Sequence, residues 1–246
     1  MQLTLLGTGT PVASLTRTGS SYLVTLGDRR ILVDCGPFSA YRLLQAGVRP
    51  TQINTLLLTH LHYDHCADYG YLVLNRWDEG DDSLPDLTVY GPTHTRRMTD
   101  LLFASDGVYG PDIANRASHP DRPKPAPRVH EVGHGAELHD ADMKLTVAEV
   151  VHCQPELTCL AYRLEAGGRS IVFGGDSAPT PVLTELATGA DILLHMCHFL
   201  NGEGVNPRMQ KICAGDVDAA LAVLRTHLDD AERSLCSYLA GEEATT

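Results

Sequence analysis

The stretch TLLLTHLHYDHCADYG, residues 55–70, constrains the fold and chemistry of this chain more than any other. An apolar run ends in His60, His62, Asp64 and His65. Alternate residues of an extended segment point the same way, so the first two histidines can face one ion, and a turn into the next helix brings the other pair around it. Nitrogen and carboxylate ligands at this density suit zinc, manganese or iron. The alternative, a histidine-rich surface turn, fits less well directly after a buried strand.

Two further polar residues close predicted strands. His152 ends KLTVAEVVH, and Asp176 ends SIVFGGD. Either one alone is weak evidence, because a histidine at a strand end is commonly solvated and an aspartate after Gly-Gly is usually a turn former. Together with the first cluster they complete a metal site built from several strand ends, which is a common place for function in α/β folds.

The rest of the chain alternates predicted strands with predicted helices. A hairpin turning at Gly27-Asp28 joins two β-rich runs, and FSAYRLLQAG predicts a helix with Phe38, Tyr41 and Leu44 on one face and Gly47 at its end. The other predicted strands are QLTLL, INTLLLT, LTVYGP, MKLTVAEVVH, TCLAYRLE, RSIVFGGD and ADILLHM, and the other predicted helices are THTRRMTDLLF, TPVLTELATG and residues 215–229. Residues 104–128 are Pro-rich and predict an irregular surface excursion. The pattern indicates an α/β fold whose sheet is not purely parallel.

Composition narrows the class of partner. With 19 Lys and Arg against 31 Asp and Glu, the formal net charge is −12, which repels polyanions such as nucleic acid at long range. The seven cysteines are scattered, and the start MQLTLLGTGT does not resemble a signal peptide, so we expect a cytoplasmic protein. No apolar run reaches the roughly 20 residues that cross a bilayer, so no membrane partner is expected. Residues 1–246 are expected to form a single domain.

These motifs resemble the metallo-β-lactamase superfamily. The resemblance rests on His60-x-His62-x-Asp64-His65, on the later His152 and on GGD, and it extends through LLGTGT, ILVDCG and ADILLHMCHF over nearly the whole chain. The order of the motifs and the GTGTP start are most similar to the ribonuclease Z-like branch. The resemblance implies an αββα four-layer sandwich with a dinuclear site in a groove at one edge. The motifs are specific for fold and metal, and much less so for substrate.

The resemblance also implies a set of ligands. His60, His62 and His152 would hold the first of two divalent ions, Asp64 and His65 the second, and Asp176 would bridge them. Zinc is the expected metal, with manganese and iron as alternatives. Two such ions can hold a hydroxide, lower its pKa and stabilise the oxyanion that forms after attack.

The last ligand of the family pattern is missing. A histidine is expected at the end of the final core strand, but the matching strand RSLCSYLAG has Tyr238 there. His227 is the other candidate, although it falls within a predicted helix. We expect Tyr238 at the site, as a weak ligand or a nearby hydroxyl, and the alternative is that it packs in the core. In either case the second metal is expected to bind weakly, or to be completed by water or substrate.

Proton transfer differs from the family pattern as well. Ribonuclease Z carries a glutamate after the histidine of LLHMCHF and a Gly-His at the next helix, whereas this chain has Met196 and Asp216 in those places. His198 can substitute as a general acid, so Asp64 and His198 are the expected catalytic residues. The alternative for His198 is a structural role in its loop.

Three cysteines and three other histidines are weaker candidates for the functional site. Cys66, Cys153 and Cys197 adjoin the candidate ligands, but nothing in the sequence resembles a thiol-protease signature, and small buried cysteines are common. The remaining histidines of the central region are expected at the surface of a loop; they are His130, His134 and His139.

The substrate is expected to be a small molecule. The long basic arm with which ribonuclease Z grips tRNA is missing, and residues 104–130 are short and Pro-rich, so tRNA is not the expected substrate. This segment and the HFLNGEGVNPRM loop are expected to wall the groove. Relatives of this branch commonly form dimers, which leaves a homodimer open.

Three functions compete. The leading hypothesis is a metal-dependent hydrolase that cleaves a phosphodiester, a lactone or another ester with a metal-activated hydroxide. The second is a mononuclear iron dioxygenase on the same fold, which an incomplete second site would suit. Diiron oxygen reductases carry a glutamate where His62 stands, which counts against that branch. The third is a non-catalytic member that only binds a ligand.

Overall fold

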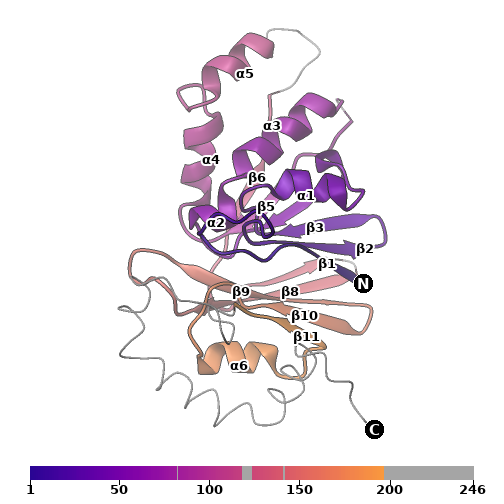
Figure 1. The fold of residues 1–246 in the computed structure, drawn as a ribbon, viewed down its shortest axis with the longest axis vertical. Helices are drawn as coiled ribbons and strands as arrows, with labels where there is room; N and C mark the ends of the chain where they lie inside the picture. Colours follow the sequence, from indigo (N-terminus) through magenta and orange to yellow (C-terminus); the bar gives the residue numbers. More distant parts are fainter. Residues whose placement is uncertain (82, 118–123, 141, 197–246) are drawn as a thin grey trace.

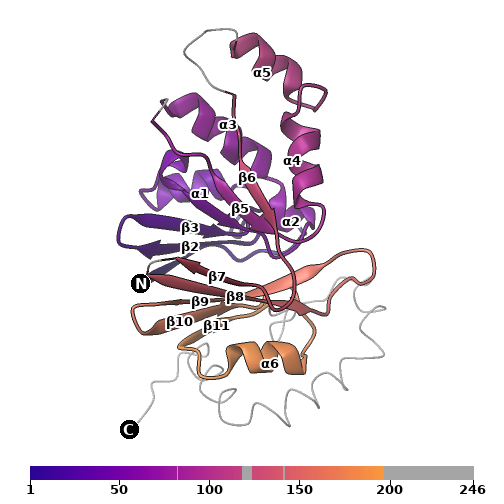
Figure 2. The same ribbon diagram turned by 180° about the vertical axis from the view of Figure 1, so that it is seen from behind.

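The computed structural model describes residues 1–81, 83–117, 124–140 and 142–196. In chain order the elements are β1 (Gln2–Gly7), β2 (Ser21–Leu26), β3 (Arg29–Val33), α1 (Ser39–Gln45), η1 (Pro50–Gln52), β4 (Thr55–Leu57), α2 (Tyr63–Cys66), α3 (Tyr69–Glu79), β5 (Thr88–Gly91), α4 (Thr95–Phe103), α5 (Gly110–Arg116), β6 (Arg128–Glu131), β7 (Glu137–Asp140), β8 (Met143–Val150), β9 (Cys159–Ala166), β10 (Arg169–Phe173), α6 (Pro181–Ala187) and β11 (Ile192–Leu194). Two sheets stack face to face, with α1, α3 and α4 over the outer face of one and α6 over the outer face of the other (Figure 1 and Figure 2). This is the predicted αββα sandwich.

Each sheet mixes strand directions. The first sheet has the order β1-β2-β3-β4-β5-β6, and its strands from β3 to β6 are parallel. The second sheet has the order β11-β10-β9-β8-β7 and is antiparallel except where β10 meets β11. Because the carboxyl ends of parallel strands meet at one edge, the loops that follow β3, β4 and β5 all leave the first sheet together. Within the described residues, no helix is long and apolar enough to cross a membrane.

Alternating side chains build three apolar layers. In β3, Leu32 faces the cluster beneath the outer helices, whereas Ile31 and Val33 face the cluster between the sheets. In β10, Val172 packs toward α6 while Ile171 faces the other sheet. This period of two is the geometry of a strand that is covered on both faces. The strands therefore anchor the loops at their ends to a core that is closed on both sides.

The hairpin and the helix after β3 form where they were predicted. Gly27 adopts a positive φ of 54° in the β2–β3 turn, and Gly47, with φ 75°, follows the end of α1. Phe38, Tyr41 and Leu44 do lie on one side, but that side faces solvent, with exposed fractions of 64%, 58% and 50%.

The buried face of α1 consists instead of Ser39, Ala40 and Leu43. Two of these side chains are small, so the helix can approach its neighbours closely. The backbone N–H of Ala40 donates to the Asp68 carboxylate at 3.1 Å, which holds this face inward.

Several predictions about the middle of the chain were wrong. Residues 104–128 are not irregular throughout, because Gly110–Arg116 forms α5, which starts with a proline in its first turn, a position that helices tolerate. The short strands β6 and β7 were missed. The strand within ADILLHM is β11, as predicted, but it is not buried: Ile192 is 41% exposed and Leu193 37% exposed at the end of the described second sheet. The predicted helix 215–229 lies outside the described residues, as does part of the predicted single domain 1–246.

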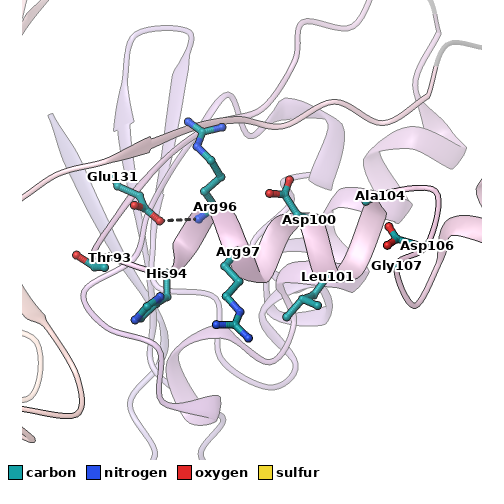
Figure 3. A pocket seen from close by; sticks show the side chains of 10 residues that line it. All are labelled: Thr93, His94, Arg96, Arg97, Asp100, Leu101, Ala104, Asp106, Gly107 and Glu131. Carbon is teal, nitrogen blue, oxygen red and sulfur yellow. Dashed lines mark hydrogen bonds between the residues drawn. The ribbon is translucent and has the colours of Figure 1, made fainter.

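A cavity of about 470 Å³ runs along the exposed side of α4 (Figure 3). It begins at the loop that follows β5 and continues to the loop that follows the helix. Its lining residues are Thr93, His94, Arg96, Arg97, Asp100, Leu101, Ala104, Asp106, Gly107 and Glu131.

Candidate metal centre

The loop after β4 carries its polar residues to the edge of the first sheet. Leu58 still pairs with β5 through a hydrogen bond from its N–H to the Tyr90 carbonyl (2.8 Å), and the Thr59 carbonyl accepts one from the N–H of Leu160 in the second sheet (2.8 Å). The next residue, His60, is fully buried. The chain then turns into α2 at His62. The candidate ligands are therefore fixed between the two sheets, at the end where the strands stop.

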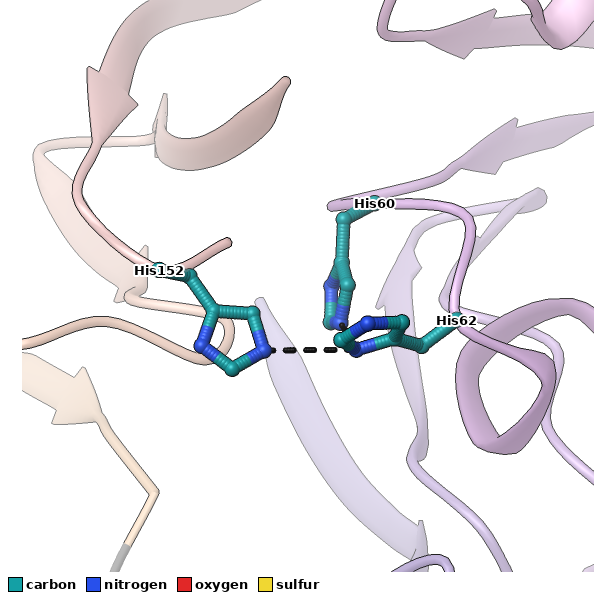
Figure 4. A group of neighbouring side chains, drawn as sticks. All are labelled: His60, His62 and His152. Carbon is teal, nitrogen blue, oxygen red and sulfur yellow. Dashed lines mark hydrogen bonds between the residues drawn. The ribbon is translucent and has the colours of Figure 1, made fainter. Parts of the chain in front are cut away.

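Three histidine nitrogens meet at one point (Figure 4). The Nδ1 atom of His62 lies 3.0 Å from Nε2 of His60 and 3.2 Å from Nε2 of His152. Nitrogens that bind zinc tetrahedrally at about 2.0–2.1 Å are about 3.3 Å apart, so these separations match the edges of such a shell. Two of the histidines come from the first sheet's loop and the third follows β8 of the second sheet. The donor set thus fits a divalent metal ion.

A second group lies beside the first and shares His60 with it. The ligand atoms of His60, His65 and Asp176 lie within 4.8 Å of one another. Nε2 of His65 is 3.5 Å from Oδ1 of Asp176 and 3.6 Å from Oδ2 of Asp64. The other oxygen of Asp176, Oδ2, is 3.8 Å from Nε2 of His152 in the first group. The structure therefore brings together all six residues that the sequence singled out, with one carboxylate reaching both groups.

A buried aspartate that the sequence analysis missed supports this centre. Oδ2 of Asp34 accepts a hydrogen bond from Nδ1 of His65 at 2.7 Å. The Thr59 hydroxyl donates to Asp34 at 2.9 Å, so it must accept from Nδ1 of His60, which is 3.0 Å away. Both histidines are thereby held with Nε2 directed into the centre, as metal-ligating histidines usually are. One feature of the sequence could have indicated this role: Asp34 directly follows the apolar run ILV, at the end of a predicted strand.

Burial and charge set the protonation of the ligands. Burial, together with the nearby His65, lowers the pKa of His60 to about 3, so its Nε2 lone pair is free at neutral pH. Burial alone would lower the pKa of His65, but the carboxylates of Asp34 and Asp176 outweigh it and raise that pKa to about 10. Burial would raise the pKa of Asp176, but its contact with His65 lowers it to about 2. A metal ion that binds His65 must therefore displace a proton.

Asp64 and His152 are shifted by burial in opposite directions. Desolvation raises the pKa of the Asp64 carboxyl group and lowers the pKa of the His152 imidazole. Both shifts favour the neutral form of the side chain. A metal ion bound beside Asp64 would stabilise its carboxylate and so oppose this effect of burial.

Some of the remaining candidates lie among the described residues and the others do not. Cys66 is no nucleophile at neutral pH, because burial raises the pKa of its thiol to about 12, and burial also raises the pKa of Cys153. His130, His134 and His139 are exposed, as predicted, although the first and last lie on β6 and β7 rather than in a loop. The other candidates lie outside the described residues: Cys197, His198, Asp216, His227 and Tyr238.

Comparisons with known sequences identify the family of this chain. The family model described as anti-Pycsar protein Apyc1 matches residues 1–235. A protein named ribonuclease Z from Mycobacterium sp. (strain KMS) is 38% identical over 197 residues, which cover 79% of this chain and 68% of that protein. A ribonuclease Z from Mycobacterium marinum (strain ATCC BAA-535 / M) is 37% identical over 199 residues, with 79% and 70% covered.

Solved structures share the fold. The metallo-β-lactamase fold protein YhfI from Bacillus subtilis superposes with a TM-score of 0.64 at 22% identity, covering 82% of this chain and 73% of that one. The short form of human tRNase Z gives 0.63 at 19% identity, covering 87% and 88%. With the sandwich, the clustered ligands and the sequence matches taken together, the chain belongs to the metallo-β-lactamase superfamily of metal-dependent hydrolases, in its ribonuclease Z-like branch and in the family described as anti-Pycsar protein Apyc1.

Proposed function

We propose that this protein hydrolyses a phosphodiester bond in a small substrate, with two divalent metal ions bound between its sheets. The observation that carries the proposal is the position of Asp176. Its Oδ1 faces His65 at 3.5 Å while its Oδ2 faces His152 at 3.8 Å, so one carboxylate serves both donor groups. Held by these residues, a pair of ions would activate a water molecule for attack and would stabilise the negative charge that develops on the substrate.

The ligands divide between the two ions. His60, His62 and His152 would hold one ion, Asp64 and His65 the other, and Asp176 would contact both. Zinc is the metal we propose, with manganese and iron as alternatives. Within the described residues the second group has fewer nitrogens than the first, so its ion is proposed to bind more weakly.

The protein's own groups hold and move the protons. Asp34 keeps Nε2 of His65 directed into the centre by accepting from Nδ1 at 2.7 Å. We propose that Asp64, whose carboxyl pKa is raised by burial, accepts a proton from the attacking water. His198 is proposed to protonate the leaving group.

Bond class and substrate size follow from different observations. The relatives at 37–38% identity are named ribonuclease Z, an enzyme of phosphodiester bonds, which supports a phosphodiester over a lactone. The net charge of −12 opposes a long polyanion. Residues 104–117 contain the compact helix α5 rather than a long basic arm. These features support a small phosphodiester over tRNA.

The test is a substrate panel with protein loaded with zinc or manganese. The panel contains bis(p-nitrophenyl) phosphate, cyclic and linear dinucleotides, cyclic mononucleotides, an aryl ester, a lactone and a precursor tRNA. We expect turnover of small phosphodiesters and a loss in kcat/KM on His60→Ala that exceeds the 10- to 100-fold typical for outer partners of metal ligands. His139→Ala, an exposed histidine on β7, is the matched control and should keep full activity. Inertness of the loaded protein across the panel, or an active His60→Ala variant, would contradict the proposal.

One observation favours a second function. His60, His65 and Asp176 present the two-histidine, one-carboxylate set that holds iron in non-haem oxygenases. Elemental analysis of protein purified without added metal separates the two. Iron accompanied by oxygen uptake would favour a dioxygenase, and zinc or manganese accompanied by phosphodiester turnover favours the hydrolase. Tight metal retention without any turnover would instead indicate a member that only binds a ligand.

A further inference from the structure

Thr59 lies between the buried carboxylate of Asp34 and His60, the first candidate ligand in the chain. Its hydroxyl oxygen is 2.9 Å from Oδ1 and 3.0 Å from Oδ2 of Asp34, and it is 3.0 Å from Nδ1 of His60. Thr59 and His60 are both buried, with exposed fractions of 1% and 0%. Solvent has almost no access to this contact, so the protein's own groups decide which nitrogen of His60 carries the proton.

The hydroxyl of Thr59 has one proton, which it donates to Asp34. An ionised carboxylate only accepts hydrogen bonds, so the hydroxyl must be the donor in that contact. Its oxygen then faces Nδ1 of His60 as an acceptor, which places the imidazole proton on Nδ1 and leaves a free lone pair on Nε2. The other histidine near this oxygen does not compete, because Nδ1 of His65 lies 3.5 Å away and donates to Asp34 at 2.7 Å.

A competing position for the proton exists on the other side of the His60 ring. Nε2 of His60 lies 3.0 Å from Nδ1 of His62, so a proton on Nε2 would find an acceptor there (Figure 4). A neutral imidazole has one N–H. His60 can therefore donate to Thr59 and keep Nε2 free for a metal ion, or donate to His62 and lose that lone pair. The contact with Thr59 stabilises the first arrangement, which is the one that metal binding requires.

The neighbouring backbone holds the Thr59 side chain in this position. A Cβ atom at Gly175 would lie 3.0 Å from Cβ and 3.3 Å from the hydroxyl oxygen of Thr59, so the two segments approach each other closely. Gly175 directly precedes Asp176, another candidate ligand. The backbone N–H of Thr59 also donates to Oδ1 of Asp34, at 2.8 Å. The hydroxyl is thus placed by contacts with both sheets.

We infer that Thr59 is a positioning residue for the ion of the three-histidine group (His60, His62 and His152), because its hydroxyl keeps the proton of His60 on Nδ1. This inference rests on the metal centre of the proposed function. Asp34 contacts His65 directly, and it contacts His60 through the Thr59 hydroxyl. The two ions are therefore expected to depend on different supporting side chains.

Nitrogen NMR of the metal-free protein at neutral pH reports the position of the proton directly. The two nitrogens of a neutral imidazole have well-separated chemical shifts, which depend on which of them is protonated. We expect the wild type to carry the His60 proton on Nδ1. Thr59→Val should move it to Nε2, because valine has a similar shape but offers no acceptor. Thr59→Ser keeps the hydroxyl and should keep the proton on Nδ1.

Metal affinity gives a second, independent measurement. Competition with a chromogenic chelator for zinc reports the tighter of two binding steps, which we assign to the three-histidine group. Thr59→Val should weaken this step about 10- to 100-fold, the usual effect of removing an outer partner of a metal ligand, and Thr59→Ser should stay within about threefold of the wild type.

Ser20→Ala is the matched control for lost stability. The buried Ser20 hydroxyl donates to Oδ2 of Asp34 at 3.0 Å, so this variant also takes a hydrogen bond from the carboxylate, but it leaves the contact between Thr59 and His60 intact. Thr59→Val and Ser20→Ala should both lower the melting temperature, since each removes a buried hydrogen bond to a charged group. Only Thr59→Val should move the His60 proton and weaken the tighter step.

Neither measurement uses turnover, so this inference and the proposed function can fail separately. A folded Thr59→Val variant that moves the proton and loses affinity in the tighter step supports the inference even if every substrate in the panel is inert. A His60 proton on Nε2 in the wild type, or a Thr59→Val variant with the proton position and affinity of the wild type, overturns it even if the protein is an active phosphodiesterase. Equal losses of affinity in Thr59→Val and Ser20→Ala would overturn it as well, because lost stability would then explain both.

Discussion

The carboxylate of Asp34 connects the metal centre to the first sheet. It is fully buried, with φ 56°, and it accepts hydrogen bonds from the Ser20 hydroxyl, from the N–H and hydroxyl of Thr59 and from Nδ1 of His65. The direction of His65 is therefore fixed by contacts of the protein before any ion binds. Preorganisation of this kind raises metal affinity, because less is lost when the ligand is ordered.

Asp34→Asn is expected to weaken metal binding about 10- to 100-fold, the usual effect of removing an outer partner of a metal ligand. Asparagine tolerates the left-handed backbone at this position, so the fold should survive. Competition with a chromogenic chelator measures the affinity. Asp28→Asn, in the exposed β2–β3 turn, is the control and should bind metal like the wild type. An unchanged affinity for Asp34→Asn would show that the contact is only structural.

The same contact predicts the pH dependence of the metal-free protein. The pKa of His65 in the fold is about 10, above its unfolded value, so its contribution to stability is complete below pH 6.5 and is lost as the pH rises through 10. The fold lowers the pKa values of His60 and His152 below 6.5, so these two histidines do not change protonation between pH 6.5 and 10.

Between pH 6.5 and 8.5 we therefore expect the free energy of unfolding of the chelated protein to fall, by at most about 1.4 kcal/mol per pH unit for one proton. Urea denaturation at a series of pH values measures it. Asp34→Asn should flatten the slope. A free energy that rises with pH in this window would refute the assignment of a charged His65.

At the residue scale the sequence revealed the candidate ligands but not the residue that supports them. His60, His62, Asp64 and His65 stand within six positions, so their spacing alone indicates a common target. The contact of Asp34 with His65 spans 31 residues and depends on how β3 packs beside β4. No local pattern reports such a contact, and a strand-end aspartate has many ordinary explanations.

At the scale of elements, one buried hydroxyl connects the two sheets at the metal-binding loop. Tyr162 of β9 donates from its hydroxyl to the Leu58 carbonyl at 2.8 Å, and the N–H of Leu160 donates to the Thr59 carbonyl beside it. The tyrosine is fully buried between the sheets. The position of the loop over the second sheet thus depends on β9.

Tyr162→Phe is expected to lower the free energy of unfolding by about 1–3 kcal/mol, because the Leu58 carbonyl loses its buried donor. Urea denaturation of the chelated protein gives the value free of metal effects. Tyr41→Phe removes an exposed hydroxyl from α1 and should cost less than about 0.5 kcal/mol. Equal stabilities of the two variants would mean that the Leu58 carbonyl finds another donor when the hydroxyl is gone.

Strands whose apolar residues form a clear run or alternation could be predicted from the sequence, whereas short strands rich in polar residues could not. The strands β2, β3, β4, β8, β9 and β10 follow from apolar runs that end in turn residues. β6 and β7 have four residues each and carry Glu131, Glu137 and Asp140, so neither run shows a clear alternation. α5 was hidden because its Gly-Pro start reads as a loop signal, although proline is tolerated in a first turn.

At the scale of the whole molecule, the candidate ligands are shared between the two sheets. His60, His62, Asp64 and His65 follow a strand of the first sheet, whereas His152 and Asp176 follow strands of the second. An ion bound by both sets of residues would therefore link the two halves of the sandwich and stabilise the folded state by mass action.

Chelation is expected to lower the melting temperature, since saturation at 100 times the dissociation constant adds about 2.7 kcal/mol to the free energy of unfolding. A thermal melt with zinc and with a chelator measures the difference. His152→Ala should shrink the metal-dependent shift, and His139→Ala should leave it intact. A metal-independent melting temperature in the wild type would show that no ion links the sheets.

Among the described residues the chain passes between the sheets once, where β6 leads to β7 through residues 132–136. Gly133, His134 and Gly135 in this passage are exposed. A cut there would produce two polypeptides, one with four candidate ligands and one with two, and neither with a full shell. Because apolar side chains of both sheets also pack against one another, a bound ion would add to the contacts that keep the two pieces associated.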